Sequence, residues 1–191
     1  MKVFGFFLLI LGSCSSVLAQ SADSLTSPSH YYSASLIRGQ IMLGSEDVRG
    51  GYALSYGYGR PEPKFRAGQI PAQLVYEGYV NHTQSAGVDP IRGDDTFAYG
   101  ALAYSRWRWP LDKNGNGIYF DLGWGLQYAS HPTIDLDTHI NSTPIAGIGG
   151  AFKSGNREYL IGLRLMHISN GGTDRPNFGD NQLMLTFSIR I

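Results

Sequence analysis

His167 and Ser169 are the polar residues whose types and spacing most favour chemistry. They lie two positions apart, so on a β-strand both side chains project from the same face. Histidine and serine are residue types that nucleophilic catalysis uses, as base and as nucleophile. Composition alone also fits a second interpretation, in which the two residues are polar only because they lie at the membrane interface, at the end of an apolar strand.

A second pattern copies the first half of a calcium-binding EF-hand loop. Asp112, Asn114, Asn116 and Gly117 have the required spacing, but Gly123 stands where a bidentate glutamate is needed. We therefore predict a hairpin turn at this position.

A third group contains metal-ligating residue types: His131, Asp135, Asp137 and His139. Its spacing follows no fixed ligand pattern, and we interpret it as a solvated polar loop.

The elements that must position these residues are β-strands, because apolar residues recur at every second position. The alternating runs are 118–128, 183–191, 159–165, 52–58, 37–43 and 74–80, and the segments 96–107 and 144–153 are strand-like with an ambiguous face. Eight strands of roughly ten residues have the length needed to cross a bilayer at a tilt.

Composition separates a membrane barrel from a soluble sheet. Only 16% of the residues are charged, whereas aromatic residues reach 13% and glycines number 25. The second face of the predicted strands carries mainly Gly, Ala and Ser, which suits the crowded interior of a small closed barrel. The predicted fold is therefore an all-β, eight-stranded antiparallel transmembrane β-barrel.

The few charges on that second face are expected to form structural ion pairs in the lumen. They are Arg38, Glu77, Asp121, Glu158, Arg164 and Arg190. The formal net charge of zero argues against nucleic acid as a partner, because no surplus of Lys and Arg is present to neutralise phosphates. The single Cys excludes a disulfide framework.

The amino-terminal segment has the features of an export signal. A lysine at position 2, an apolar run and the small residues before Gln20 predict a signal peptide over 1–19. The alternative is a lipoprotein signal with lipidation at Cys14. A polar lead-in over 20–33 and a barrel over 34–191 then follow, and an exported barrel belongs in the outer membrane.

Connection lengths predict the orientation of the barrel. With an even strand number both ends lie on the periplasmic side, where turns are short. Connections 45–51, 82–95, 129–142 and 170–181 then lie outside, and connections 60–70, 110–116 and 154–156 lie inside, of which 60–70 is long. The register of the strand that contains Leu165 continues into His167 and Ser169, so both are expected on the lipid-facing side at the outer leaflet.

The segment 166–181 resembles the lipid A 3-O-deacylase (PagL) family. It reads His-x-Ser-Asn-small-Gly and then Pro-Asn-x-Gly, at the start of the last predicted hairpin. This motif covers about sixteen residues, and the export signal and strand number extend the similarity loosely over the rest. Members of this family are outer-membrane esterases with a Ser-His-acid triad on the exterior of the barrel.

The resemblance implies a role for each motif residue. Ser169 would be the nucleophile and His167 its general base. Asn177 and the backbone N–H of Gly172 would match the oxyanion donors, and Asn170 would support the motif. No metal or cofactor is implied, and Arg175 is a candidate partner for lipid phosphates.

The acid position departs from the family pattern. The family has a glutamate fourteen residues after the histidine, where this chain has Asn181. Asn181 could orient the imidazole without supplying a negative charge. Asp180 or Asp174 could instead reach His167 if the strand begins irregularly, and an inactive relative is the third alternative.

The function that the resemblance implies is removal of the 3-linked acyl chain of lipid A in lipopolysaccharide, within the outer membrane. Two hypotheses of other classes compete with it. One is a catalytically silent structural or binding barrel of the same fold, and the other is a soluble periplasmic lipid-binding β protein.

Overall fold

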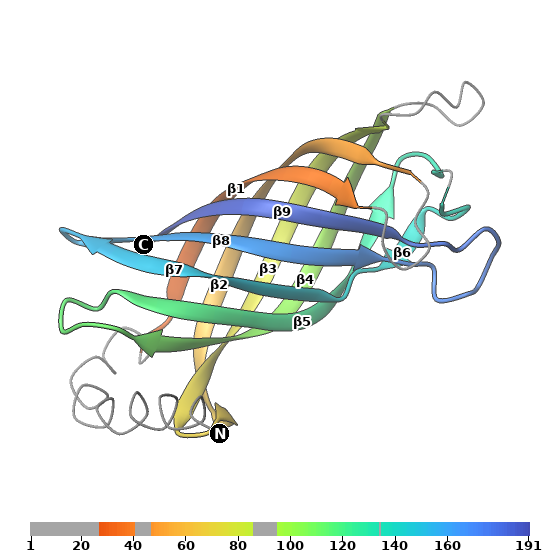
Figure 1. The fold of residues 1–191 in the computed structure, drawn as a ribbon. Coiled ribbons are helices and arrows are strands. Elements are labelled where there is room, and N and C mark those ends of the chain that lie inside the picture. The colour runs from red at the N-terminus through yellow and green to blue at the C-terminus, as the bar shows by residue number, and fades with distance from the viewer. Residues whose placement is uncertain (1–26, 41–46, 86–94, 134) are drawn as a thin grey trace, which may run out of the picture.

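The computed structural model describes residues 27–40, 47–85, 95–133 and 135–191, which form one closed antiparallel β-barrel (Figure 1). Its strands are β1 (Ser29–Gln40), β2 (Arg49–Ala67), β3 (Ile70–Ser85), β4 (Asp95–Pro110), β5 (Gly117–Ala129), β6 (Ile140–Ser142), β7 (Ile145–Ser154), β8 (Arg157–Ile168) and β9 (Asp180–Arg190). Each strand pairs with its sequence neighbours, except that β6 and β7 both pair with β5 and not with each other, and β1 pairs with β9 to close the ring.

The two short strands β6 and β7 together form one wall strand. Both pair with β5, at Leu126–Tyr128 and at Gly117–Gly123. Pro144 interrupts them because proline has no backbone N–H to donate to the ladder. The barrel therefore has eight wall strands, which confirms the predicted fold class. No helix among the described residues is long and apolar enough to cross a membrane.

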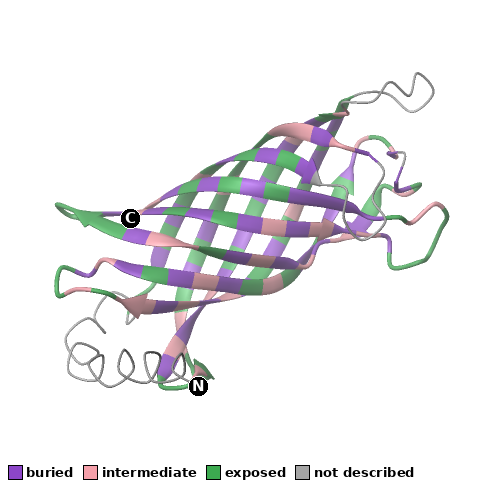
Figure 2. Ribbon diagram, in the orientation of Figure 1, coloured by how far each residue is buried: buried purple, intermediate pink, exposed green. Residues whose placement is uncertain are grey.

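The two faces of the wall alternate residue by residue. Figure 2 shows buried and exposed residues alternating along the strands. Large apolar side chains such as Leu36, Val80 and Trp124 are exposed on the outer face, each by more than half of its surface. The inner face buries a core that includes Tyr31, Val75 and Tyr104. An apolar outer surface over a filled interior suits a barrel whose outer wall contacts lipid.

The predicted lumen ion pairs form, with one exception. Arg164 binds Glu77 through two hydrogen bonds of 2.7 and 3.1 Å, and Arg106 binds Asp121 through two of 2.7 Å. Glu158 pairs with Arg190 at 3.0 Å and with Arg108. The sequence analysis did not include Arg106 and Arg108 in this network.

Arg38 is the exception, and its predicted lumen position is wrong. Ile37 is buried at 5% exposure, while Leu36 and Arg38 are exposed on the outer face. The sequence analysis assigned Ile37 to the lipid face because it is apolar. The structure places it in the lumen, where it belongs to the same apolar core as Tyr31.

Three predicted boundaries need correction or lie outside the described residues. The barrel begins at Ser29, so the lead-in predicted over 20–33 is too long. The predicted long inner connection 60–70 is wrong, because β2 and β3 continue as a hairpin to a turn at Gly68, whose φ is +62° (Figure 1). The predicted signal peptide 1–19 and Cys14 lie outside the described residues.

Candidate active site

His167 and Ser169 lie at the end of β8 on the outer face of the wall. Along β8 the odd-numbered residues from Tyr159 onward are exposed or half-buried, and the even-numbered ones are buried. This alternation continues through half-buried His167 and Ser169. Ser169 follows the last residue of β8 and is held by a backbone pair with Ser142, with N···O distances of 2.7 and 3.1 Å. The polar pair thus continues the apolar stripe of β8.

Asn181 orients the imidazole of His167. The two residues pair across β8 and β9, and Nδ1 of His167 lies 2.8 Å from Oδ1 of Asn181. An amide oxygen only accepts, so Nδ1 carries the proton and Nε2 keeps its lone pair. Asn181 is fully buried. This geometry leaves Nε2 as the basic atom of the pair.

Gly179 covers the other side of the imidazole. Its φ is +77°, and a Cβ at this position would lie 2.5 Å from Cε1 of His167. The backbone therefore approaches the ring more closely than any other residue type would allow. The sequence analysis gave this glycine no role, although the Pro-Asn-x-Gly pattern contains it.

The hydroxyl of Ser169 is held by the loop that follows β8. It donates to Oδ1 of Asn177 at 3.3 Å and accepts from the backbone N–H of Gly171 at 3.0 Å. The backbone N–H of Asn170 donates to the same Oδ1 at 3.1 Å, which fixes the amide with its oxygen toward Ser169. Oδ1 of Asn177 is thus occupied, and Nδ2 is the donor atom of this amide that could bind an oxyanion.

Gly172 does not point its N–H at Ser169. That N–H donates to Oδ1 of Asn170 at 2.9 Å, and Nδ2 of Asn170 donates to the carbonyl of Asp174 at 3.0 Å. Asn170 is buried and holds the loop in shape through these bonds. In this structure the backbone N–H of Gly171, rather than that of Gly172, donates to the hydroxyl of Ser169.

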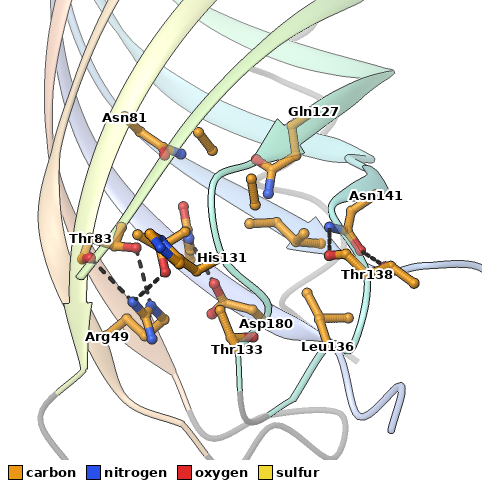
Figure 3. Close-up of a pocket in the computed structure, with 15 residues that line it drawn as sticks. Arg49, Asn81, Thr83, Gln127, His131, Thr133, Leu136, Thr138, Asn141 and Asp180 are labelled. Carbon is orange, nitrogen blue, oxygen red and sulfur yellow. Dashed lines mark hydrogen bonds between the residues drawn. The ribbon is translucent and has the colours of Figure 1, made fainter. Parts of the chain in front are cut away.

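The two aspartates considered as substitute acids lie elsewhere. Asp180 faces the lumen, where Nε2 of Gln182 donates to it at 2.8 Å, and Figure 3 shows it in a cavity at the barrel mouth with Thr133 and Leu136. Asp174 is exposed in the loop, where its carboxylate accepts from the backbone N–H of Arg175 at 2.8 Å. Arg175 is exposed as well. Among the described side chains, the hydrogen-bond partner of His167 is Asn181.

The connection between β5 and β6 supports this loop from the lumen side. Leu136 pairs with Asn177 as an isolated bridge, and the backbone N–H of Phe178 donates to the carbonyl of Asp135 at 3.0 Å. The carboxylate of Asp135 is fully buried and accepts from the backbone N–H of Asp47 at 2.9 Å. The segment that carries Asn177 is thus tied to the start of β2.

The interpretation of this connection as a solvated loop is therefore wrong in part. Asp135 is buried, whereas His131, Asp137 and His139 are exposed, and His131 lines the mouth cavity. No group of three or more metal-ligating side chains gathers within the described residues. At the other end of the barrel, Asp112 accepts from the backbone N–H groups of Asn114 and Asn116 at 2.9 and 3.0 Å in the turn between β4 and β5.

The arrangement contains the parts of a nucleophilic acyl-transfer site. A hydroxyl and an imidazole with a basic nitrogen lie two residues apart on one face, and the hydroxyl accepts from the backbone N–H of Gly171 and donates to the amide oxygen of Asn177. No hydrogen bond joins His167 and Ser169 in the described structure, and Ser169 donates to Asn177 instead. Such contacts are often loose without substrate and tighten when it binds.

Comparisons with known proteins identify a family and solved structures that this chain resembles. The family model described as Lipid A 3-O-deacylase (PagL) matches residues 49–190. The crystal structure of the outer membrane enzyme PagL aligns at 16% identity and a TM-score of 0.57, covering 82% of this chain and 97% of that chain. Neisserial surface protein A aligns at 13% identity and a TM-score of 0.59, covering 86% and 96%. No curated protein matches the sequence.

Proposed function

Because the chain belongs to the lipid A 3-O-deacylase (PagL) family, we propose that it is an outer-membrane esterase that removes the 3-O-linked acyl chain of lipid A. The observation that carries this proposal is the contact of 2.8 Å between His167 and Asn181. It leaves Nε2 basic on the same outer face as the hydroxyl of Ser169. The substrate class comes from the family, and the residue roles come from the motif and the geometry.

The first half of the reaction transfers the acyl group to the protein. Oγ of Ser169 attacks the ester carbonyl while Nε2 of His167 accepts the hydroxyl proton. Nδ2 of Asn177 and a backbone N–H of the loop stabilise the oxyanion, and one such donor contributes about 3 kcal/mol. The imidazolium then gives its proton to the sugar oxygen as the carbon–oxygen bond breaks.

The second half releases the fatty acid. Water attacks the acyl-serine ester, again with Nε2 of His167 as base, and the proton returns to Oγ of Ser169. The products are a 3-hydroxy fatty acid and lipid A with a free hydroxyl. Asn181 lacks the negative charge that would stabilise the imidazolium, so we expect a slower reaction than with a carboxylate in its place.

The location of the site suits a substrate that stays in the membrane. The scissile ester would lie beside Ser169 at headgroup depth. Its acyl chain would follow the exposed or half-buried outer-face residues of β8 and β9, which are Leu163, Leu165, Leu183 and Leu185. A site in the lumen would require the lipid to leave the bilayer, at the cost of exposing its acyl chains to water.

Mass spectrometry of lipid A tests the proposal. Lipid A from cells or vesicles that contain the protein should lose one hydroxyacyl chain, and this loss should vanish in Ser169→Ala. The matched control is Ser33→Ala, a serine on β1 whose hydroxyl donates to Oγ of Ser188 at 2.8 Å. Unchanged lipid A with correctly folded wild-type protein would contradict the esterase.

A catalytically silent barrel is the second candidate function. Two observations favour it: Asn181 at the acid position, and the hydroxyl of Ser169 donating to Asn177 rather than to His167. A fluorophosphonate probe separates the two functions, because only an activated serine reacts with it. Labelling of the wild type that is lost in Ser169→Ala supports the enzyme, and absence of labelling supports the silent barrel.

A further inference from the structure

Arg38 places a cation on the outer wall close to the candidate active site. It lies near the end of β1, where Leu36 is 66% exposed, Ile37 is 5% exposed and Arg38 is again exposed. This alternation turns the side chain of Arg38 toward the surroundings of the barrel. Arg38 is therefore on the same face as His167 and Ser169.

The strand register fixes how near Arg38 is to the site. Arg38 pairs with Leu183, and Leu183 pairs with Leu165 on β8. His167 is two residues beyond Leu165 on the same face. From strand spacing and rise, the Cα atoms of Arg38 and His167 are roughly 12 Å apart along the wall. A phosphorylated sugar ring that spans this gap brings a phosphate and an ester to the two residues at once.

Among the described residues, the environment of Arg38 is apolar and holds no counter-ion. Its neighbours across the strands are Gly50, which has no side chain, and Leu183. No salt bridge or side-chain hydrogen bond to Arg38 is found among the described residues. A cation on the lipid face is unfavourable unless it reaches the headgroups and pairs there. The missing partner is thus an anion at headgroup depth.

Arg38 differs from the other cations of the described strands in its direction or its partners. Arg60, at the opposite end of β2, lies 5.9 Å from the ring of Tyr76 and 3.9 Å from Glu62. At the end of the barrel that carries the candidate site, the described strands also contain Arg49 and Arg164. Arg49 is buried with Asp47 at 2.7 Å, and Arg164 is buried with Glu77 at 2.7 Å. Arg38 is therefore the strand cation at that end that faces outward.

An apolar hollow lies directly below Arg38 on the same face. Ala34, Leu36, Tyr52, Leu54, Ile161, Leu185 and Phe187 line it. The small side chain of Ala34 opens this space between larger neighbours. An anion-binding guanidinium above an apolar hollow matches an amphiphile with a phosphorylated headgroup and acyl chains.

We propose that Arg38 binds the phosphate on the sugar of lipid A that bears the 3-O ester, and that it thereby holds this ester beside Ser169. The proposal rests on the proposed function for the identity of the lipid. Guanidinium groups bind phosphate through paired, charge-assisted hydrogen bonds. Arg38 is a specificity residue, because it binds a part of the substrate that does not react.

The kinetic experiment uses the full-length protein in vesicles with two substrates. One is lipid A, and the other is lipid A from which the phosphate on the ester-bearing sugar has been removed. We expect Arg38→Gln to raise KM for the first about fivefold to tenfold with little change in kcat, and to leave KM for the second unchanged. Arg38→Lys should restore part of the affinity. The control Arg60→Gln should leave KM unchanged for both substrates.

A binding experiment keeps the proposal testable if the proposed function fails. Native mass spectrometry of the Ser169→Ala protein should show a larger bound fraction of the phosphorylated lipid than of the dephosphorylated one, and Arg38→Gln should abolish this difference. Equal binding of both lipids to the Ser169→Ala protein would overturn the phosphate contact. An Arg38→Gln substitution that lowers the bound fraction of both lipids equally would overturn it as well. Absence of deacylation together with phosphate-dependent binding would overturn the esterase and leave this inference standing.

Discussion

Asn181 accepts a hydrogen bond from Nδ1 of His167 at 2.8 Å, in the position where the resemblance to the family implies an acid. The contact fixes the tautomer that leaves Nε2 basic, and it does so without charge. Orientation and charge stabilisation, which a carboxylate supplies together, are therefore separated in this chain.

Replacing Asn181 tests these two contributions. We expect Asn181→Leu to lower kcat about 100-fold because the imidazole loses its orientation, and Asn181→Glu to raise kcat about tenfold because a charge is added. Steady-state kinetics on lipid A vesicles measures both. A Glu variant without gain, combined with loss of activity in Asp180→Ala, would move the acid role to Asp180.

Gly179 gives a second test, because its backbone lies against the ring of His167. A methyl group there would lie 2.5 Å from Cε1, so Gly179→Ala should displace the imidazole and lower kcat at least about tenfold. The matched control is Gly155→Ala in the turn between β7 and β8, where φ is +59° and nothing lies within 4 Å. It carries the same backbone strain of roughly 1 kcal/mol and should retain activity. Equal activity of the two variants contradicts the role of Gly179.

Asp135 should act on catalysis through Asn177. Its buried carboxylate holds the β5–β6 connection, and Leu136 in that connection pairs with Asn177. We expect Asp135→Ala to lower kcat about tenfold with KM unchanged, and to have little further effect in an Asn177→Ala background. Asp135→Asn should restore activity because its amide oxygen can still accept from Asp47.

The control for Asp135 lies in the same connection. Thr138→Val removes a hydroxyl that bonds Ile140 and Asn141 rather than the segment 176–178, and kcat should stay at the wild-type value. Additive losses in the double variant of Asp135 and Asn177 would show that Asp135 does not act through Asn177.

The lumen ion pair of Glu77 and Arg164 should contribute to stability and not to activity. Glu77→Leu leaves a buried guanidinium without its carboxylate, which typically costs about 3–5 kcal/mol. The double variant Glu77→Leu with Arg164→Met should recover most of that loss, because both charges are then absent. Urea unfolding followed by heat-modifiable gel mobility measures the midpoint. A double variant as unstable as the single one is the opposing outcome.

The sequence predicts the barrel because apolar residues alternate with small or polar ones within each strand. The odd residues of β8 and β9 face outward as their pattern indicates, and the same parity places Asn181 beside His167 and turns Asp180 into the lumen. Local alternation fails at Arg38 because a narrow lumen is itself partly apolar. Ile37 fits inside as well as outside, and the polarity of one residue cannot fix the register there.

Long-range contacts account for the features that the sequence did not predict. The sequence analysis predicts a long connection over 60–70, yet Pro61 in this segment pairs with Gln73 in an extended hairpin. Asp135 indicated a solvated loop, yet its partner is the backbone of Asp47 far away in the chain. Spacing within a segment does not encode such pairings. The approach of Gly179 to His167 likewise depends on the path of the whole loop.

The outward direction of Ser169 makes any reaction at this wall a two-dimensional process. A lipid substrate would reach the hydroxyl by lateral diffusion within its leaflet, without dissolving in water first. The relevant concentration is then the surface density of substrate, and inert lipid mixed into the leaflet slows the reaction by dilution. Packing and curvature of the leaflet would regulate such a protein as directly as its own residues do.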